Sequence, residues 1–200
     1  MAQAAPLTLV SLEEYLDLEE TAVDKHELFR GQIYAMVGGS SNHGEIIDSL
    51  AQVCGRALRG KKPCRFISDN RKVVVKEEGS GYYPDGAVAY PPSYVSPSRG
   101  TYDNPTIVFE VLSPSTERFD RTDKADDYKS LSSLRDYVLI ESEKVRVEVF
   151  SRLDEGGWVQ RVYLPGTVAH VPSVGIDLPL SELYENAIFE EVLASPIEED

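Results

Sequence analysis

Apolar residues are spaced in two ways along this chain, at three- and four-residue steps in some stretches and at alternating or consecutive positions in others. The helical spacing is clearest from Ser41 to about Arg59, where it predicts a helix with one apolar stripe. A shorter helix is expected over residues 11–20, because Ser11 and Glu14 have the spacing of a capping box. A third helix is predicted from about Asp120 to Leu131.

Alternating and continuous apolar runs predict the strands. The stretch HELFRGQIYAMVGG indicates a hairpin around Arg30 and Gly31, closed by Gly38 and Gly39. Further strands are expected in CRFIS, RKVVVKE, PDGAVAY, TIVFEVL, RDYVLIES, KVRVEVFSRL and WVQRVYL. Glycine, proline and serine mark EEGSGYY as a turn and PPSYVSPSRGTYDNP as a loop, and IDLPLSELY is expected to end in a short helix.

This order of elements predicts an α/β (α+β) fold, with one mixed central sheet flanked by helices, an N-terminal hairpin and C-terminal antiparallel strands. Two hundred residues are enough for one domain with its own hydrophobic core. We expect this domain to span residues 1–200, with the core in about 26–165 and an acidic tail in about 190–200.

Composition favours a globular protein, since 42% of the residues are hydrophobic. The N-terminal stretch lacks the basic start and apolar run of a signal peptide, and no run approaches the roughly 18 apolar residues of a membrane-spanning helix. Cys54 and Cys64 are the only cysteines, and with few histidines to join them they favour buried reduced thiols over a zinc site. We therefore expect a cytoplasmic protein with no membrane partner.

The net charge of −14 argues against a nucleic-acid partner, but the charge is unevenly distributed. Residues 55–72 carry +6, which leaves −20 for the rest of the chain. A local basic face can contact a phosphate backbone, while a solvated helix end and loop is the alternative interpretation. The candidate backbone contacts are Arg56, Arg59, Lys61, Lys62, Arg65, Arg71 and Lys72.

Glu110 poses the main chemical question, because it lies near the end of a strand that the pattern predicts to be buried. From Thr106 to Leu112, apolar residues occur at positions on both faces, so both faces should be covered. A buried carboxylate stays ionised only beside a cation or several hydrogen-bond donors. Glu110 therefore requires a partner.

Asp85 and Lys124 can complete a site around Glu110. Because Pro84 begins a strand, Asp85 lies near its start, and the two carboxylates converge if their strands are neighbours. Mg²⁺ is commonly held by one or two carboxylates, so Asp85 and Glu110 are candidate ligands of Mg²⁺, with Mn²⁺ as a substitute. Lys124 begins the following helix and would orient the attacking water or stabilise developing charge, with Tyr128 on the same helical face. Taken alone, each residue also has a structural interpretation: Asp85 as a turn residue, and Lys124 as a solvated side chain on an exposed helix face.

The segments YYPDGAV, PTIVFEVLSPST and FDRTDKADDYKSLSSLRDYVLI together resemble the Uma-type family of putative restriction endonucleases, which belongs to the PD-(D/E)XK nuclease superfamily. The resemblance covers most of the chain, since HELFRGQIYAMVGGSSNHGEIIDSLAQ is similar to the family's N-terminal hairpin and helix, and RVEVFSRLDEGGW to its C-terminal strands. It implies a restriction endonuclease-like core and Mg²⁺-dependent phosphodiester hydrolysis.

Carried over to this sequence, the resemblance implies that Asp85 and Glu110 are the two metal ligands of the motif. The usual lysine two positions after the glutamate is replaced by Leu112. Lys124 resembles a lysine displaced to the following helix, and this departure leaves its role open.

Glu27 and His43 also fall at positions that resemble family motifs, and with Tyr128 they are accessory candidates. Glu27 is either a further acidic ligand or a hydrogen-bond acceptor of the hairpin. His43 either contacts substrate or caps its helix.

These observations together predict a metal-dependent endonuclease that acts on DNA. The alternative is a non-catalytic nucleic-acid-binding or interaction module on the same fold, favoured by the displaced lysine and the acidic charge. A third hypothesis is a scaffold that self-associates through the strand edge of KVRVEVF. A homodimer is compatible with a nuclease as well.

Overall fold

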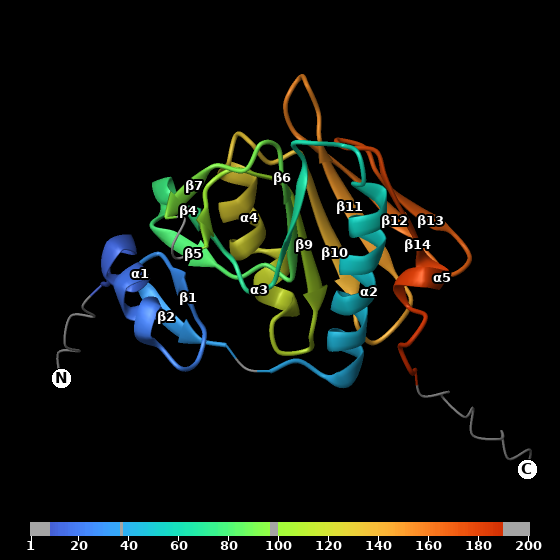
Figure 1. Cartoon of the computed structure of the whole chain (residues 1–200). Helices are drawn as coiled ribbons and strands as arrows, with labels where there is room; N and C mark the ends of the chain where they lie inside the picture. The colour runs from blue at the N-terminus through green and yellow to red at the C-terminus, as the bar shows by residue number, and fades with distance from the viewer. Residues whose placement is uncertain (1–8, 37, 97–99, 190–200) are drawn as a thin grey trace, which may run out of the picture.

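The computed structural model describes residues 9–36, 38–96 and 100–189, so the predicted acidic tail lies outside the described residues. The described strands form two six-stranded sheets and one two-stranded sheet, packed with helices (Figure 1). The first six-stranded sheet, which we call the central sheet, has the order β12 (Trp158–Tyr163), β11 (Val147–Arg152), β10 (Asp136–Glu141), β9 (Pro105–Leu112), β6 (Gly86–Ala89) and β3 (Arg65–Ser68). Only β9 and β10 pair in parallel in it, so the sheet is mixed.

The second six-stranded sheet, the outer sheet, carries the N-terminal hairpin. Its order is β2 (Gln32–Ala35), β1 (His26–Phe29), β5 (Ser80–Tyr82), β4 (Lys72–Val75), β8 (Thr101–Tyr102) and β7 (Tyr94–Ser96). The hairpin joins the rest of this sheet at one register pair, Leu28 opposite Gly81. The two-stranded sheet consists of β13 (Val168–Val171) and β14 (Ile176–Pro179).

Six helices complete the described chain: α1 (Leu12–Thr21), α2 (Ser41–Ala57), the 3₁₀ helix η1 (Lys76–Glu78), α3 (Glu117–Arg121), α4 (Asp123–Ser130) and α5 (Leu180–Leu183). The predicted capping box of α1 is confirmed, since Ser11 and Glu14 exchange side-chain-to-backbone hydrogen bonds. Within the described residues, no helix is both long and apolar enough to cross a lipid bilayer.

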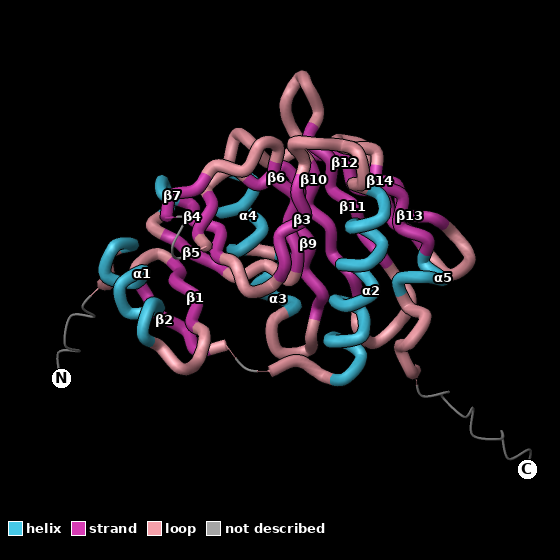
Figure 2. Tube along the Cα trace, viewed as in Figure 1, coloured by secondary structure: helices cyan, strands magenta, loops and turns pink. Residues whose placement is uncertain are grey.

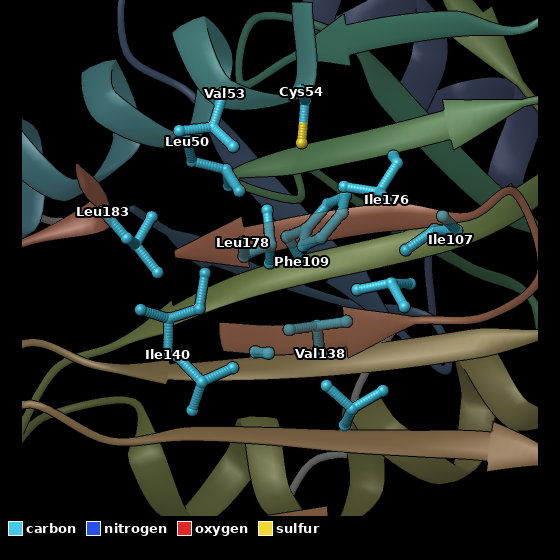
Figure 3. Packing of buried hydrophobic residues seen from close by; sticks show 14 of the residues in the cluster. Leu50, Val53, Cys54, Ile107, Phe109, Val138, Ile140, Ile176, Leu178 and Leu183 are labelled. Atoms are coloured by element: carbon cyan, nitrogen blue, oxygen red, sulfur yellow. The ribbon is translucent and has the colours of Figure 1, made fainter. Parts of the chain in front are cut away.

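The central sheet has a hydrophobic core on each face. Figure 3 shows one of these cores, in which Leu50 and Cys54 of α2 and Leu178 of β14 surround Phe109 of β9. The other core contains Val108 of β9 and Tyr128 of α4, together with residues of the outer sheet. Strand β9 is therefore covered on both sides, as predicted, and a polar side chain on it must find its partner inside the protein.

The predicted mixed α+β class with flanking helices is confirmed, but the prediction of one central sheet is wrong. The hairpin of β1 and β2 belongs to a second sheet, because β5 forms within EEGSGYY and pairs with β1. The segment interpreted as a loop also contributes β7 and β8, and β13 was not predicted. These strands have two to four residues, which is too short for a periodic pattern.

Two further expectations are corrected. The helix predicted from Asp120 to Leu131 is divided into α3 and α4 at Thr122, whose φ of −119° and ψ of −98° are not helical. The segment KVRVEVF forms β11, which is paired with β10 on one side and β12 on the other. Because β11 has no free edge, it cannot serve as the self-association edge that the scaffold hypothesis requires.

Candidate active site

A pocket of about 690 Å³ lies where the hairpin, the start of α2 and the C-terminal end of β9 meet. Figure 2 shows the connections before α2 and after β9 along the same edge of the molecule. Five of the residues predicted for the site line this pocket: Glu27, His43, Asp85, Glu110 and Lys124.

The position of Glu110 follows from the alternation along β9. Val108 and Leu112 share its face and enter the core that contains α4, so Glu110 points toward α4 and is 3% exposed. Strands β6 and β9 are neighbours, with Gly86 opposite Phe109. This register brings Asp85, the residue before Gly86, to the end of β9 where Glu110 lies.

Lys124 is the buried cation that Glu110 requires. Its Nζ lies 3.0 Å from Glu110 Oε1, 3.0 Å from Glu27 Oε1 and 3.4 Å from Asp120 Oδ1. These carboxylates come from β9, β1 and α3, so the ammonium joins the outer sheet, the central sheet and the helices between them. We call Lys124 and its three carboxylates the lysine cage.

The lysine cage carries more negative than positive charge. Burial raises the pKa of Glu110 well above its ordinary value, Lys124 opposes this shift, and the carboxylates of Asp120, Asp85 and Glu27 add to it. Burial alone would lower the pKa of Lys124, but the same surrounding carboxylates raise it well above its ordinary value. Lys124 is thus a permanent cation, whereas Glu110 binds a proton more readily than an exposed glutamate.

Asp85 is held at the pocket by two contacts. The backbone N–H of Val111 donates to Asp85 Oδ2 at 2.7 Å, and His43 Nε2 lies 3.5 Å from the same oxygen. The hydrogen bond to Asp85 raises the pKa of His43, although burial opposes the shift. Ser40 accepts the backbone N–H of His43 and caps α2, so the His43 imidazole is directed to Asp85 instead of serving as the cap.

Two further residues, Asp120 and Tyr128, lie close to Lys124 along the chain. Asp120 was not predicted, yet it lines the pocket and contacts Lys124; the i, i+4 spacing of the pair was the available signal. Tyr128 is on the face of α4 that carries Lys124, but it does not line the pocket. It is fully buried beside Tyr82 and Tyr137, with ring centroids 5.2 and 5.8 Å away, which is a packing position.

The predicted basic stretch does not reach the pocket, and none of its seven residues lines it. Arg56 is close to the far end of α2, about 20 Å from His43 at 1.5 Å per residue. Arg56 is paired with Glu182, and Lys61 donates to the carbonyls of Val174 and Gly175. Lys72 is buried and donates to Tyr83 Oη, so it is not accessible to a phosphate backbone.

The donor set fits a hard divalent cation. The pocket is lined by the carboxylates of Glu27, Asp85, Glu110, Asp120 and Asp123 against one ammonium. Glu110 Oε1 is buried and accepts no hydrogen bond, because the nearby ammonium is not aligned to donate one. No group of three or more His, Cys, Asp or Glu side chains within the described residues is arranged to hold a metal. Two carboxylates completed by water oxygens are sufficient for Mg²⁺.

The chain is similar to a known protein family, to two bacterial proteins and to a solved structure. The family model described as "Uma2: Putative restriction endonuclease" matches residues 12–181. Two uncharacterised proteins of Synechocystis are similar over most of their lengths. One is 35% identical, over 93% of this chain and 97% of the relative. The other is 31% identical, over 80% of this chain and 90% of the relative. The crystal structure of a "putative nuclease" from Anabaena variabilis has the same fold, with a TM-score of 0.70, 18% identity, and coverage of 88% of this chain and 98% of its own.

Proposed function

The chain belongs to the Uma2 family of putative restriction endonucleases, and from this premise we propose that it is a metal-dependent endonuclease that hydrolyses phosphodiester bonds, with DNA as its substrate. The observation that carries the proposal is the meeting of Asp85 and Glu110, from neighbouring strands, in a pocket where Lys124 lies 3.0 Å from Glu110. Two acidic oxygen donors and a fixed ammonium are the groups that phosphodiester hydrolysis requires.

Asp85 and Glu110 would hold Mg²⁺, or Mn²⁺ in its place. The bound ion supplies a water of lowered pKa and neutralises charge on the phosphate. Asp85 would be oriented for this role by the Val111 N–H, which fixes one carboxylate oxygen and leaves the other available to the ion.

Lys124 would stabilise the negative charge that develops on the phosphate. Because its pKa is raised, it stays protonated and acts as a charge donor, not as the base that accepts the proton of the water. Glu27 and Asp120 hold the ammonium in place from the sides of the pocket. Ser113, Ser115 and Thr116 also line the pocket, and the Ser113 hydroxyl lies 3.0 Å from the hydroxyls of the other two. These hydroxyls would donate hydrogen bonds to phosphate oxygens.

A second candidate function is nucleic-acid binding without cleavage. It is favoured by the ion pair of Lys124 and Glu110, because Lys124 already supplies the cation that a buried glutamate requires. In that case Glu110 would stabilise the fold and no divalent ion would be needed.

Nicking of supercoiled plasmid at low salt separates the two functions. We expect the wild-type protein to nick the plasmid with Mg²⁺ or Mn²⁺, to stop in EDTA and to recover when Mg²⁺ is restored. Asp85→Asn should be slower by about 10- to 100-fold, since its amide oxygen is needed to accept the Val111 N–H and the uncharged amide nitrogen that is left cannot bind the ion. The matched control is Glu45→Gln, an exposed acid on α2 that does not line the pocket, which should nick at the wild-type rate.

Equal nicking by all three proteins would indicate a contaminating nuclease. Binding of the plasmid without nicking in any metal would support the binding function instead.

Metal affinity should increase with pH. The raised pKa of Glu110 means that this carboxyl keeps its proton above pH 4.5, and a protonated carboxyl is a poor ligand. Deprotonation as the pH rises therefore adds affinity, by up to about tenfold per pH unit until the pKa of Glu110 is passed. Calorimetric titration with Mn²⁺ at pH 5.5, 6.5 and 7.5, in buffers of different ionisation enthalpy, measures both the affinity and the proton released. An affinity that is constant across this range, with no proton release, would contradict the prediction.

A further inference from the structure

The lining of the pocket includes two chemically different sets of side chains. One set is the lysine cage with Asp85. The other set, which we call the apolar wall, consists of Phe29, Tyr34, Met36 and Phe119, and Tyr34 lies opposite Glu27 of the lysine cage in the pairing of β1 with β2. A ligand that contacts both sets would combine a flat apolar part with a group that binds a divalent ion held by the carboxylates.

Tyr34 is the most exposed of the aromatic side chains on this apolar wall. It lies on β2, the edge strand of the outer sheet, and is 49% exposed. Its hydroxyl donates to Gln32 Oε1 at 2.6 Å, which restrains the ring at one end. Phe29 and Phe119 instead contact each other edge to face at 5.1 Å, and within the described residues no aromatic ring packs on Tyr34.

The charge of the pocket makes the phosphates of a nucleic acid a poor source of affinity. Among the described residues, Lys124 is the only lysine or arginine that lines the pocket, beside five carboxylates. The basic stretch is about 20 Å away along α2. Stacking on an aromatic side chain does not depend on charge, and every base has a face that can stack.

We propose that the pocket binds one unpaired nucleotide, with its base stacked on Tyr34 and its phosphate at the divalent ion that Asp85 and Glu110 would hold, so that the protein prefers single-stranded nucleic acid. This inference rests on the proposed function, because it places the phosphate at the proposed metal ligands. In a duplex the base faces are covered by neighbouring base pairs, so Tyr34 has no face to stack on. Met36, 38% exposed, extends the same apolar wall.

The experiment compares binding of one fluorescently labelled 12-nucleotide DNA as a single strand and as a blunt duplex. Anisotropy is measured in Ca²⁺ with wild type, Tyr34→Phe, Tyr34→Ala and the control Tyr90→Ala. Tyr90 is an exposed tyrosine outside the pocket. We expect wild type, Tyr34→Phe and Tyr90→Ala to bind the single strand about tenfold more tightly than the duplex. Tyr34→Ala should lose about tenfold for the single strand and little for the duplex.

Single-strand affinity that is unchanged in Tyr34→Ala would overturn the inference, and so would an equal loss for both probes. If wild type nicks plasmid while Tyr34→Ala binds normally, this inference fails and the proposed function stands. If Tyr34-dependent binding occurs without cleavage in any metal, the proposed function fails and the stacking site stands. Tyr34 on the edge strand β2 could instead contact a second copy of the protein, which sedimentation of the same variants tests. If wild type is a dimer, Tyr34→Ala is a monomer and the affinity for the single strand is unchanged, the inference is also overturned.

Discussion

Glu110→Ala is expected to lower metal-dependent nicking of supercoiled plasmid by about a thousandfold or more. The substitution removes both carboxylate oxygens, so on the proposed function the ion would lose a charged ligand and the phosphate would lose its alignment with Lys124. Rates are measured with saturating Mg²⁺ and again with Mn²⁺. The loss should exceed that of Asp85→Asn, which keeps one oxygen in place.

The control for Glu110→Ala must separate lost chemistry from lost structure. Circular dichroism and thermal unfolding show whether the variant is folded at the assay temperature. Calorimetry with Mn²⁺ should show weakened binding in the same preparation. A folded Glu110→Ala protein that retains the wild-type rate would contradict the assignment of Glu110 as a ligand.

Lys124→Met should be the most destabilising single change in the site. It leaves Glu27, Glu110 and Asp120 around a buried position without their cation. Removing one partner of a buried ion pair costs about 3–5 kcal/mol, which for a chain of this size lowers Tm by about 10 °C. Thermal unfolding in EDTA measures the loss.

Two comparisons make this prediction specific to the lysine cage. Lys129→Met alters the same helix, but Lys129 lies over the Phe150 ring, 4.6 Å from its centroid, and should cost about 1 kcal/mol. Millimolar Mn²⁺ should raise the Tm of Lys124→Met more than that of wild type, because a divalent ion replaces the missing charge. If both lysine variants lose the same stability, the carboxylates do not depend on Lys124.

The site residues that could be predicted are those whose position follows from their neighbours in the sequence. Glu110 stood out because β9 has apolar residues on both faces, and two buried faces leave a carboxylate no route to water. Asp85 was placed by Pro84 at a strand start. Lys124 was found from the family resemblance and from its place in a helix after β9.

What could not be predicted depends on contacts between distant segments. Nothing near Glu27 in the sequence indicates that its carboxylate meets Lys124, since β1 is placed beside the lysine cage by its contacts with distant segments such as β5. The basic residues between Arg56 and Lys72 are close in sequence, but the structure distributes them over the end of α2, the following loop, the start of β3 and the buried strand β4. Their contact with a phosphate backbone stays a prediction.

The position of β2 at the edge of the outer sheet makes this strand an exchangeable part of the protein. Strand β2 packs on no further strand within the described residues, and its four residues are exposed. The segment from Gln32 to Met36 contributes Tyr34, Ala35 and Met36 to the pocket, whereas Arg30 before it is fixed by an ion pair with the buried Asp127 of α4. Grafting this segment from a relative, with Glu27 retained, is a route to transferring ligand preference while the scaffold that holds the carboxylates stays the same.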